Sequence, residues 1–316
     1  MTVSATNTFT GKGIAESFSD VIFDISPEET PLLSMAKRTT AGQTYHQWQT
    51  DALAAAAANA QLEGDDASFA TLGATTVLGN YCQISRKTVQ ISGTYEVVKK
   101  YGRKSQKAFQ LMKAGKELKK DIDYALTRNQ ASRAGSAGTA RLSAGMESWI
   151  AGNRVLQNTG GTTPGFSTGI VAAPTDGTAK TFTEAVFKTA LQASWTDGGD
   201  ASVVLMSIKN KGRFAAFSGI ATKYNEVKGT AEATIIGAAD IYVSDVGTHT
   251  VKLSRQMRDN AVLGIDPDYV SVAFLRPIQK EELAKTGDSS KDLLLAEYCL
   301  VVNNPDAHCK VQGTGA

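Results

Sequence analysis

The serine at position 167 lies in a pattern associated with nucleophilic catalysis. The stretch GFSTG, residues 165–169, matches G-x-S-x-G with Ser167 at its centre. In that motif a strand precedes the serine and a helix follows it, so that a strained turn presents the hydroxyl for attack. Here NTGGTTP precedes the motif and IVAAPTDG follows it, and neither flank is predicted to form the required element. Residues 165–169 are therefore predicted to form a flexible surface loop, and a serine hydrolase at Ser167 is kept only as an alternative.

The sequence lacks the residue spacings that usually bind a metal ion or a cofactor. His46, His249 and His308 are far apart, and none stands in an H-x-x-x-H or C-x-x-C setting. The glycine-rich region before residue 170 has no G-K-[ST] end, so it lacks the lysine and the hydroxyl that hold a nucleotide and its magnesium. Asp121 and Asp123 are two residues apart on a predicted helix, where side chains at that spacing do not share a face. We predict no metal, no cofactor and no enzymatic activity.

A basic segment runs from residue 99 to residue 120, with nine basic residues and a single acid, Glu117. Three interpretations stay open: a solvated helix face, contact with an acidic surface such as residues 16–29 of another copy, or contact with nucleic acid. The net charge of the whole chain is only +2, which argues against a dedicated nucleic-acid condenser. A DNA-binding protein using segment 99–120 is therefore an alternative function. The residues that would face an acidic partner or DNA are Lys99, Lys100, Arg103, Lys104 and Lys107.

The composition is that of a globular protein. Its 316 residues and 42% hydrophobic content allow one large domain or two ordinary ones with a sizeable core. The first twenty residues lack the basic and apolar regions of a secretory signal, and no window approaches the ~18 consecutive apolar residues of a membrane-spanning helix. The cysteines, Cys82, Cys299 and Cys309, are odd in number and widely spaced. We expect synthesis in a reducing cytoplasm, no membrane partner, and thiols that serve as small core residues.

The predicted elements combine helices and strands without regular alternation, which indicates an α+β class. Residues 103–131 carry the strongest helix signal, because apolar and small residues recur at spacings of four and three from Ala108 to Asn129. A helix of ~26 residues would be about 40 Å long, enough to support a sheet. A second helix is predicted at residues 181–195, and strands separated by polar turns follow from residue 202 to the end.

Two segments have little to bury on their own chain. Residues 1–43 are predicted to form an arm, in which acidic residues precede a small apolar cluster. Residues 44–92 are predicted to form two long strands that project from the body, joined by an alanine-rich segment with acidic residues near its tip. Apolar appendages that cannot be buried on their own body must be buried on another chain, which favours a self-assembling structural protein. The predicted inter-subunit contacts in these segments are Pro31, Leu32, Leu33, Met35, Glu63, Asp65 and Asp66.

Both ends of the sequence resemble a known protein family. DISPEETPLLSMAKR followed by TYHQWQTDAL looks like the amino-terminal signature of a group of tailed-bacteriophage major capsid (head) proteins. The carboxy-terminal block resembles that of the same group, in the order LRP, LAKTGDS, EY and NNPDAH. The two blocks occur in the family's order, whereas the middle of the chain, about 150–240, matches only in general character.

The resemblance implies the Hong Kong 97-type capsid fold, an α+β fold. The implied layout is an N-terminal arm at 1–43, an extended loop (E-loop) at 44–92, a peripheral domain with a long spine helix at 93–149 and 262–316, and an inserted axial domain at 150–261. Trp48, Asp51 and Leu53 would lie on the ascending strand of the E-loop and join the predicted inter-subunit contacts. The arm and the loop would reach across neighbouring subunits, so that their apolar residues are buried only in the assembled shell.

The implied function is structural. Many copies would form pentamers and hexamers that close into an icosahedral head around double-stranded DNA, made in the bacterial host cytoplasm and located in the virion capsid. The partners would be other copies of the chain, the packaged DNA on the inner face, a portal, and separate scaffold or decoration proteins. The chain begins directly with the arm, so any scaffold is expected to be a separate protein. Residues 51–79 contain no lysine, so the lysine–asparagine cross-link of the family's prototype is not expected at this loop.

Overall fold

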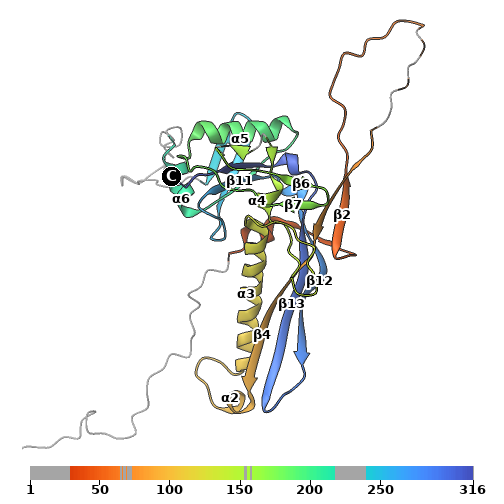
Figure 1. Cartoon of the computed structure of the whole chain (residues 1–316). Coiled ribbons are helices and arrows are strands. Elements are labelled where there is room, and N and C mark those ends of the chain that lie inside the picture. Colours follow the sequence, from red (N-terminus) through yellow and green to blue (C-terminus); the bar gives the residue numbers. More distant parts are fainter. Residues whose placement is uncertain are drawn as a thin grey trace, which may run out of the picture.

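The computed structural model describes residues 29–64, 66, 69, 73–152, 155–156, 159–217 and 240–315. Helices and sheets form an elongated part and a rounder part, and a long loop extends away from both (Figure 1). The α+β class predicted from the sequence is confirmed. No helix in the described ranges is long and apolar enough to cross a membrane.

The elongated part is a four-stranded sheet packed against one long helix. The strand order is β1-β12-β13-β4. The bounds of the strands are Lys37–Thr40 for β1, Val270–Leu283 for β12, Ser289–Val302 for β13 and Gln83–Ser92 for β4. β12 and β13 form a long antiparallel hairpin, β4 pairs antiparallel with β13, and the short β1 pairs parallel with β12. Figure 1 shows α3 running along this sheet.

The helix α3 spans Gln106–Thr127, shorter at both ends than the predicted 103–131. Its buried face repeats at spacings of four and three through Ala114, Leu118, Ile122 and Ala125, whereas the predicted stripe member Ala108 is exposed. The helix starts at Ser105, whose hydroxyl accepts a hydrogen bond from the Ala108 N–H at 3.1 Å. A second short helix, α2 (Gly93–Val97), lies next to this end of α3.

The rounder part is a six-stranded sheet of order β5-β14-β11-β8-β10-β9. The bounds are Val155–Leu156 for β5, Cys309–Gln312 for β14, Ala261–Ile265 for β11, Val203–Met206 for β8, Gly247–Leu253 for β10 and Ile241–Ser244 for β9. The helices α5 (Glu184–Thr196) and α6 (Ile208–Ala215) lie with this sheet (Figure 1). Phe187 and Leu191 on α5 and Phe214 on α6 are buried in a cluster with Val204 of β8.

Two antiparallel hairpins form two-stranded sheets of their own. β2 (Tyr45–Thr50) pairs with β3 (Thr76–Tyr81), and the described residues between them, 51–64, 66, 69 and 73–75, belong to the projecting loop of Figure 1. β6 (Gly165–Ser167) pairs with β7 (Ile170–Ala172). The GFSTG stretch is thus a strand and a tight turn, not the flexible loop predicted from its composition. Thr168 in that turn has a φ of 49°, and the following Gly169 has a φ of 85°.

The largest apolar core lies where the two parts meet. It contains Leu118 and Ile122 from α3, Trp149 from the short helix α4 (Met146–Trp149), Leu263 from β11 and Leu300 from β13. The strands β11 and β14 come from the part of the chain that the predicted layout assigns to the peripheral domain, yet they pair within the six-stranded sheet. The described ranges also contain three short helical turns, α1 (Pro31–Met35), η2 (Pro267–Tyr269) and η3 (Pro305–Ala307).

Candidate inter-subunit surfaces

The apolar turn of the predicted arm is anchored on its own chain. Leu32 and Leu33 of α1 are buried in the core together with Leu118 and Ile122, while Pro31 and Met35 are half-buried. Their burial differs from the prediction that these residues are buried only by a neighbouring subunit. The physical reason is that one apolar helical turn finds a matching apolar face on α3, so it needs no second chain. The acidic residues at positions 16, 20, 24 and 28 lie outside the described residues.

A buried carboxylate fixes this turn to α3. Asp123 Oδ1 accepts a hydrogen bond from the Leu33 N–H at 2.8 Å. Burial raises the pKa of the Asp123 carboxyl to about 6, and the N–H groups of Leu33 and Leu32 act in the opposite direction. Asp123 therefore supplies the cap of α1, because the preceding Thr30 makes no side-chain capping bond. The sequence placed Asp123 on a helix but offered no sign of this partner.

The loop between β2 and β3 exposes large apolar side chains. Leu53, Leu62 and Phe69 are 99%, 80% and 98% exposed. The hydrogen bonds of residues 51–64 are short-range, such as Ala52 N–H to Asp51 Oδ1 at 2.9 Å and Gln61 Nε2 to Asn59 Oδ1 at 2.9 Å. In Figure 1 this loop extends far from both sheets. Three exposed large apolar side chains on one extended segment are typical of a surface that another molecule covers.

Four acidic residues were predicted to contact other subunits from this loop, and the structure describes three of them. Asp51 lies at the end of β2 and is exposed, as are Glu63 and Asp66. Asp65 lies outside the described residues. The described acidic side chains thus lie on the same segment as the exposed apolar ones.

The base of the loop, in contrast, is held firmly by its own chain. Trp48 Nε1 donates a hydrogen bond to the Val302 carbonyl at 3.1 Å, and its ring centroid lies 5.5 Å from that of Trp149. The Tyr45 hydroxyl donates to the Gly169 carbonyl at 2.9 Å. Trp48 therefore faces the body of its own subunit, which differs from its predicted role as an inter-subunit contact. It positions the loop instead.

Asn80, which sequence reasoning missed, is a further anchor of the loop. It is fully buried, and its Nδ2 donates to the Leu300 carbonyl at 2.8 Å and to Ser143 Oγ at 3.1 Å. Its Oδ1 accepts from the Ala144 N–H at 2.9 Å. A buried amide with each of its groups paired fixes strand position, because any displacement would leave donors unpaired. The signal available in the sequence was an asparagine inside a strand otherwise rich in apolar residues.

Three residues of the basic segment, residues 99–120, form hydrogen bonds or ion pairs with their own chain. Lys100 Nζ donates to the carbonyls of Glu96 and Val98 at 2.8 and 3.0 Å, and Arg103 donates to the Tyr95 hydroxyl at 3.1 Å. Lys107 pairs with Glu282 and with the buried Asp292, each at 3.1 Å. Hydrogen bonds with these two acids raise the pKa of Lys107. These three residues thus stabilise their own chain, which differs from their predicted role as partner-facing groups.

Lys99 and Lys104 remain as candidates for an outside partner. Both are exposed and have no hydrogen bond or ion pair within the described part of the chain. Exposed apolar residues lie beside them: Val97 is 86% exposed, Tyr101 63% and Val98 54%. We call this mixed basic and apolar area, residues 97–104, the distal surface, because it lies at the α2 end of the elongated part (Figure 1). Its mixture fits a protein partner as well as a nucleic acid.

A third set of exposed apolar residues lies on the rounder part and was also missed by sequence reasoning. Trp195 at the end of α5 is 63% exposed and Ile208 at the start of α6 is 71% exposed. On β9, an edge strand of the six-stranded sheet, Ile241 and Val243 are exposed and flank the buried Tyr242. An edge strand with exposed apolar side chains is prone to pair with another chain.

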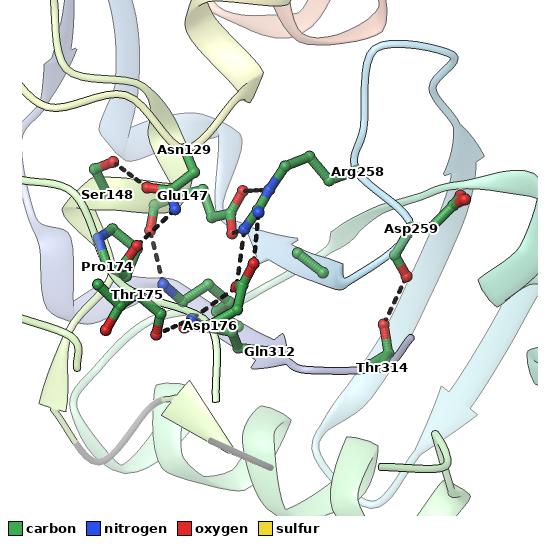
Figure 2. Close-up of polar contacts among 12 residues, drawn as sticks. Asn129, Glu147, Ser148, Pro174, Thr175, Asp176, Arg258, Asp259, Gln312 and Thr314 are labelled. Atoms are coloured by element: carbon green, nitrogen blue, oxygen red, sulfur yellow. Dashed lines mark hydrogen bonds and ion pairs between the residues drawn. The ribbon is translucent and has the colours of Figure 1, made fainter. Parts of the chain in front are cut away.

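A buried ionic cluster joins the two parts (Figure 2). Arg258, just before β11, donates to Glu147 of α4 through its Nε at 3.1 Å, and to Asp176 at 2.7 and 3.1 Å. Glu147 has only 1% of its side chain exposed. Burial lowers the pKa of the Arg258 guanidinium, but the two carboxylates outweigh burial and raise it overall. Removal of Arg258 would therefore leave a buried, unpaired carboxylate.

β14 completes this cluster. Lys310 is fully buried and its Nζ donates to the Glu147 carbonyl at 2.8 Å, while burial lowers its pKa to about 8. Gln312 Nε2 donates to Asp176 Oδ1 and to the Thr175 carbonyl, each at 3.0 Å. The ion pairs of Arg258 connect the segment before β11 with α4 and Asp176, and hydrogen bonds from Lys310 and Gln312 add β14 to the cluster (Figure 2).

The residues considered for catalysis are separate from one another. Ser167 is exposed at the end of β6, where no described histidine hydrogen-bonds to it. His249 does contact a serine, with Nε2 at 2.7 Å from Ser244 Oγ and Nδ1 at 2.8 Å from the Ala201 carbonyl. Ser244 Oγ also accepts from the Val246 N–H at 3.2 Å, which is the pattern of a turn-stabilising serine. The described residues contain no group of three metal-ligating side chains.

Comparison with known proteins identifies the family of the chain. Residues 2–315 match the family model described as SU10 major capsid protein. The major capsid protein of Escherichia phage Phieco32 is 40% identical over 116 residues, which are 36% of this chain and 33% of that relative. The match thus spans about a third of the relative's length.

Solved structures resemble the chain over almost its whole length. The Cyanophage A-1(L) capsid asymmetric unit has a TM-score of 0.69 at 13% identity and covers 98% of this chain and 99% of its own. Microbacterium phage Oxtober96 has a TM-score of 0.63 at 10% identity and covers 95% and 96%. The phage G gp27 major capsid proteins with gp26 decoration proteins have a TM-score of 0.56 at 11% identity and cover 99% and 100%. The fold is therefore that of phage capsid proteins of the Hong Kong 97 type, as predicted.

Proposed function

Because the chain belongs to the SU10 major capsid protein family, with a match from residue 2 to residue 315, we propose that it is the structural subunit of a phage head. Many copies form pentamers and hexamers that close into an icosahedral shell around double-stranded DNA. The protein is made in the bacterial host cytoplasm and becomes part of the virion. Its partners besides other copies are a portal and separate scaffold or decoration proteins.

The observation that carries the proposal is the projecting loop. Leu53, Leu62 and Phe69 are almost fully exposed on a segment whose hydrogen bonds are local. Burial of each such side chain contributes roughly 1.5–3 kcal/mol, so a neighbouring copy that covers the loop gains several kcal/mol at every contact. In a closed shell each copy both offers a loop and receives one, which multiplies this gain over the particle. Asp51, Glu63, Asp65 and Asp66 belong to the same proposed contact.

The domain layout is part of the proposal. The arm at 1–43 and the E-loop at 44–92 contact neighbouring subunits through their parts outside α1, β1 and β4, because these three elements pack on their own chain. The peripheral domain contains α3 together with the β12–β13 hairpin. Sheet membership supports one change, because β11 and β14 pair with β8 and β5. We therefore place residues 261–265 and 309–312 with the axial domain at 150–261. The exposed Ile241 and Val243 on its edge strand are proposed contacts between axial domains.

The shell is proposed to be held without a covalent bond at the loop. Residues 51–79 contain no lysine that could form an isopeptide bond. Interlocking subunits and accessory proteins then supply the strength. Purified particles boiled in detergent should migrate as single chains on a denaturing gel, and ladders of cross-linked multimers would contradict this part of the proposal.

The proposed assembly is tested with a loop variant and a matched control. The variant carries Leu53→Ser, Leu62→Ser and Phe69→Ser, and the control carries Ala54→Ser, Ala56→Ser and Ala58→Ser in the same exposed segment. Wild type, variant and control are compared by negative-stain electron microscopy and light scattering, with the neighbouring head proteins co-expressed. We expect shells or capsomer rings from wild type and control, and single chains of 33.4 kDa from the variant. Full assembly of the variant would refute the role of the loop, and no particles from any sample would refute the capsid function.

A second interpretation concerns the distal surface. Lys99 and Lys104 are exposed and free of ion pairs within the described residues, so they are available to DNA or to an acidic surface of another copy. The adjoining Val97 and Tyr101 favour the acidic protein partner, because a phosphate backbone offers nothing to cover them. Binding of the unassembled protein to double-stranded DNA, with a steep salt dependence, would instead favour the DNA-binding alternative.

A further inference from the structure

Two of the three cysteines lie in one buried cluster at the base of the β2–β3 hairpin. The antiparallel pairing of β4 with β13 ends with Gln83 opposite Tyr298. Cys82 precedes Gln83 and Cys299 follows Tyr298, so both cysteines adjoin the last pair of this ladder. Both side chains are fully buried, in a cluster of small residues that also contains Ala41 and Ala273.

The backbone of Cys82 leaves its side chain free to approach Cys299. The Cys82 N–H donates to the Thr44 carbonyl at 2.8 Å, and its carbonyl accepts from Arg141 Nε at 3.2 Å. Both backbone groups are thus engaged with residues other than Cys299. A disulfide joins Cα atoms about 4.4–6.8 Å apart, which is the spacing that the two strands must adopt here when the bond forms.

The two thiols already interact. The neighbouring Cys299 thiol lowers the pKa of Cys82, whereas Cys82 and burial raise the pKa of Cys299. The Cys82 thiol in turn lies 3.5 Å from the Gln43 carbonyl. Because the thiolate is the reactive form, Cys82 is the sulfur that reacts first and Cys299 is the sulfur that resolves the product.

We propose that Cys82 and Cys299 are oxidised to an intrachain disulfide once the protein leaves the reducing cytoplasm. The bond ties the base of the projecting loop to β13. A hydroperoxide is the oxidant: the Cys82 sulfur attacks its O–O bond, which breaks to give a sulfenic acid and an alcohol, or water from hydrogen peroxide. The Cys299 sulfur then attacks the sulfenic sulfur. The S–S bond forms, the S–O bond breaks, and the hydroxide leaves as water with the Cys299 proton.

A route for a small oxidant exists beside the pair. A cavity of about 460 Å³ is lined by Arg141, Ile84 and the 134–140 segment. Arg141, which lines this cavity, donates a hydrogen bond to the Cys82 carbonyl, so the cavity wall includes a direct neighbour of Cys82. Because both sulfurs are buried, the reaction requires brief local opening and is expected to be slow.

Cys309 provides an internal control within the same chain. It is buried in the six-stranded sheet, where Gly264 stands opposite it in the neighbouring strand β11. Burial raises the pKa of its thiol to about 12. Cys309 therefore has neither a partner sulfur nor thiolate character, and it stays a thiol under conditions that oxidise the pair.

The test uses the full-length protein purified under a reducing agent and then treated with hydrogen peroxide. After denaturation and alkylation we expect the number of free thiols to fall from three to one. The intact mass should fall by about 2 Da, and mapping without reduction should find the peptide of Cys82 joined to that of Cys299. Cys309→Ser should form the same bond, whereas Cys82→Ser and Cys299→Ser should retain two free thiols.

The proposal is overturned by any of three results with wild type and Cys309→Ser, the two proteins that keep the pair. These are an unchanged thiol count, a bond between two chains or to Cys309, and addition of oxygen to Cys82 while Cys299 stays free. None of these readouts depends on shell formation. The disulfide and the capsid function can therefore fail separately.

Discussion

Replacement of Asp123 by asparagine tests the anchor between α1 and α3. The Asp123 carboxyl is fully buried, accepts the Leu33 N–H at 2.8 Å, and has a pKa of about 6 because of burial. The ordinary pKa of this group is 3.8, so folding shifts it by about 2 units, equivalent to about 3 kcal/mol. The folded chain keeps the proton in a range where the unfolded chain releases it. The contribution of protonated Asp123 to the free energy of unfolding is therefore fully present below about pH 4, and it is lost as the pH rises through about 6.

Asp123→Asn keeps an oxygen acceptor for the Leu33 N–H but cannot ionise. We expect the free energy of unfolding of the variant, relative to wild type, to rise by about 3 kcal/mol between pH 4 and pH 7. Urea unfolding followed by circular dichroism, on dilute unassembled protein at each pH, measures this difference. The contributions of all other titrating groups cancel in this difference, because both proteins contain the same groups.

A matched control lies two residues away on the same helix. Asp121 pairs with Lys87 at 2.7 Å, but 51% of its side chain is exposed, so Asp121→Asn should change stability by at most about 1 kcal/mol. A difference between Asp123→Asn and wild type that stays constant from pH 4 to pH 7 would refute the reasoning. An equal pH-dependent change in Asp121→Asn would refute it as well.

Three further predictions concern other contacts. Arg258→Met leaves the buried Glu147 carboxylate unpaired and should lower the free energy of unfolding by about 3–5 kcal/mol. Adding Glu147→Gln to the same chain should restore most of this loss. A loss under about 1 kcal/mol in urea unfolding would contradict the prediction. Ser105→Ala removes the cap of α3 and should cost about 0.5–2 kcal/mol by the same assay, whereas an unchanged midpoint would show that the cap is not needed. Assembly followed by light scattering should slow as salt rises from about 0.05 to 0.5 M, because the exposed Lys99 and Lys104 are then screened; a rate insensitive to salt would remove charge steering.

The long helix and the loop hairpin could be predicted because their signals are local. The apolar stripe around Leu118 and Ile122 recurs within a few residues, and the alternation in residues 45–50 is equally short-range. The ends of α3 were predicted less well. Its start is set by the capping hydroxyl of Ser105 and by the Glu96 carboxylate, which accepts from the Gln106 N–H at 3.0 Å. Caps that come from a neighbouring helix are invisible to a periodicity argument.

The anchors and the ionic cluster could not be predicted because their partners are remote in sequence. Glu147 and Arg258 are 111 positions apart, and Leu33 and Asp123 are 90 positions apart. The separation of 90 positions between Leu33 and Asp123 also explains why the sequence assigned the apolar turn of the arm to a neighbouring subunit. An apolar turn such as Leu32–Leu33 looks the same in sequence whether α3 of its own chain or a second chain buries it. The 165–172 hairpin was missed because glycine and threonine weaken the strand signal, while the pairing of Gly165 with Ala172 decides the structure.

The contrast between a rigid base and an exposed tip explains how one segment can serve both the free subunit and the shell. Trp48, Tyr45 and Asn80 fix the direction in which the loop leaves the body, so a neighbouring copy meets a loop that has already lost part of its conformational freedom. In the proposed shell a neighbouring copy buries Leu53 and Phe69, which are 99% and 98% exposed on the described part of their own chain. Charged residues on the same segment disfavour indiscriminate apolar contacts in the free subunit. Because each contact is repeated over the whole shell, a modest free energy per loop suffices for a stable particle, and weak single contacts let misplaced subunits dissociate before the shell closes.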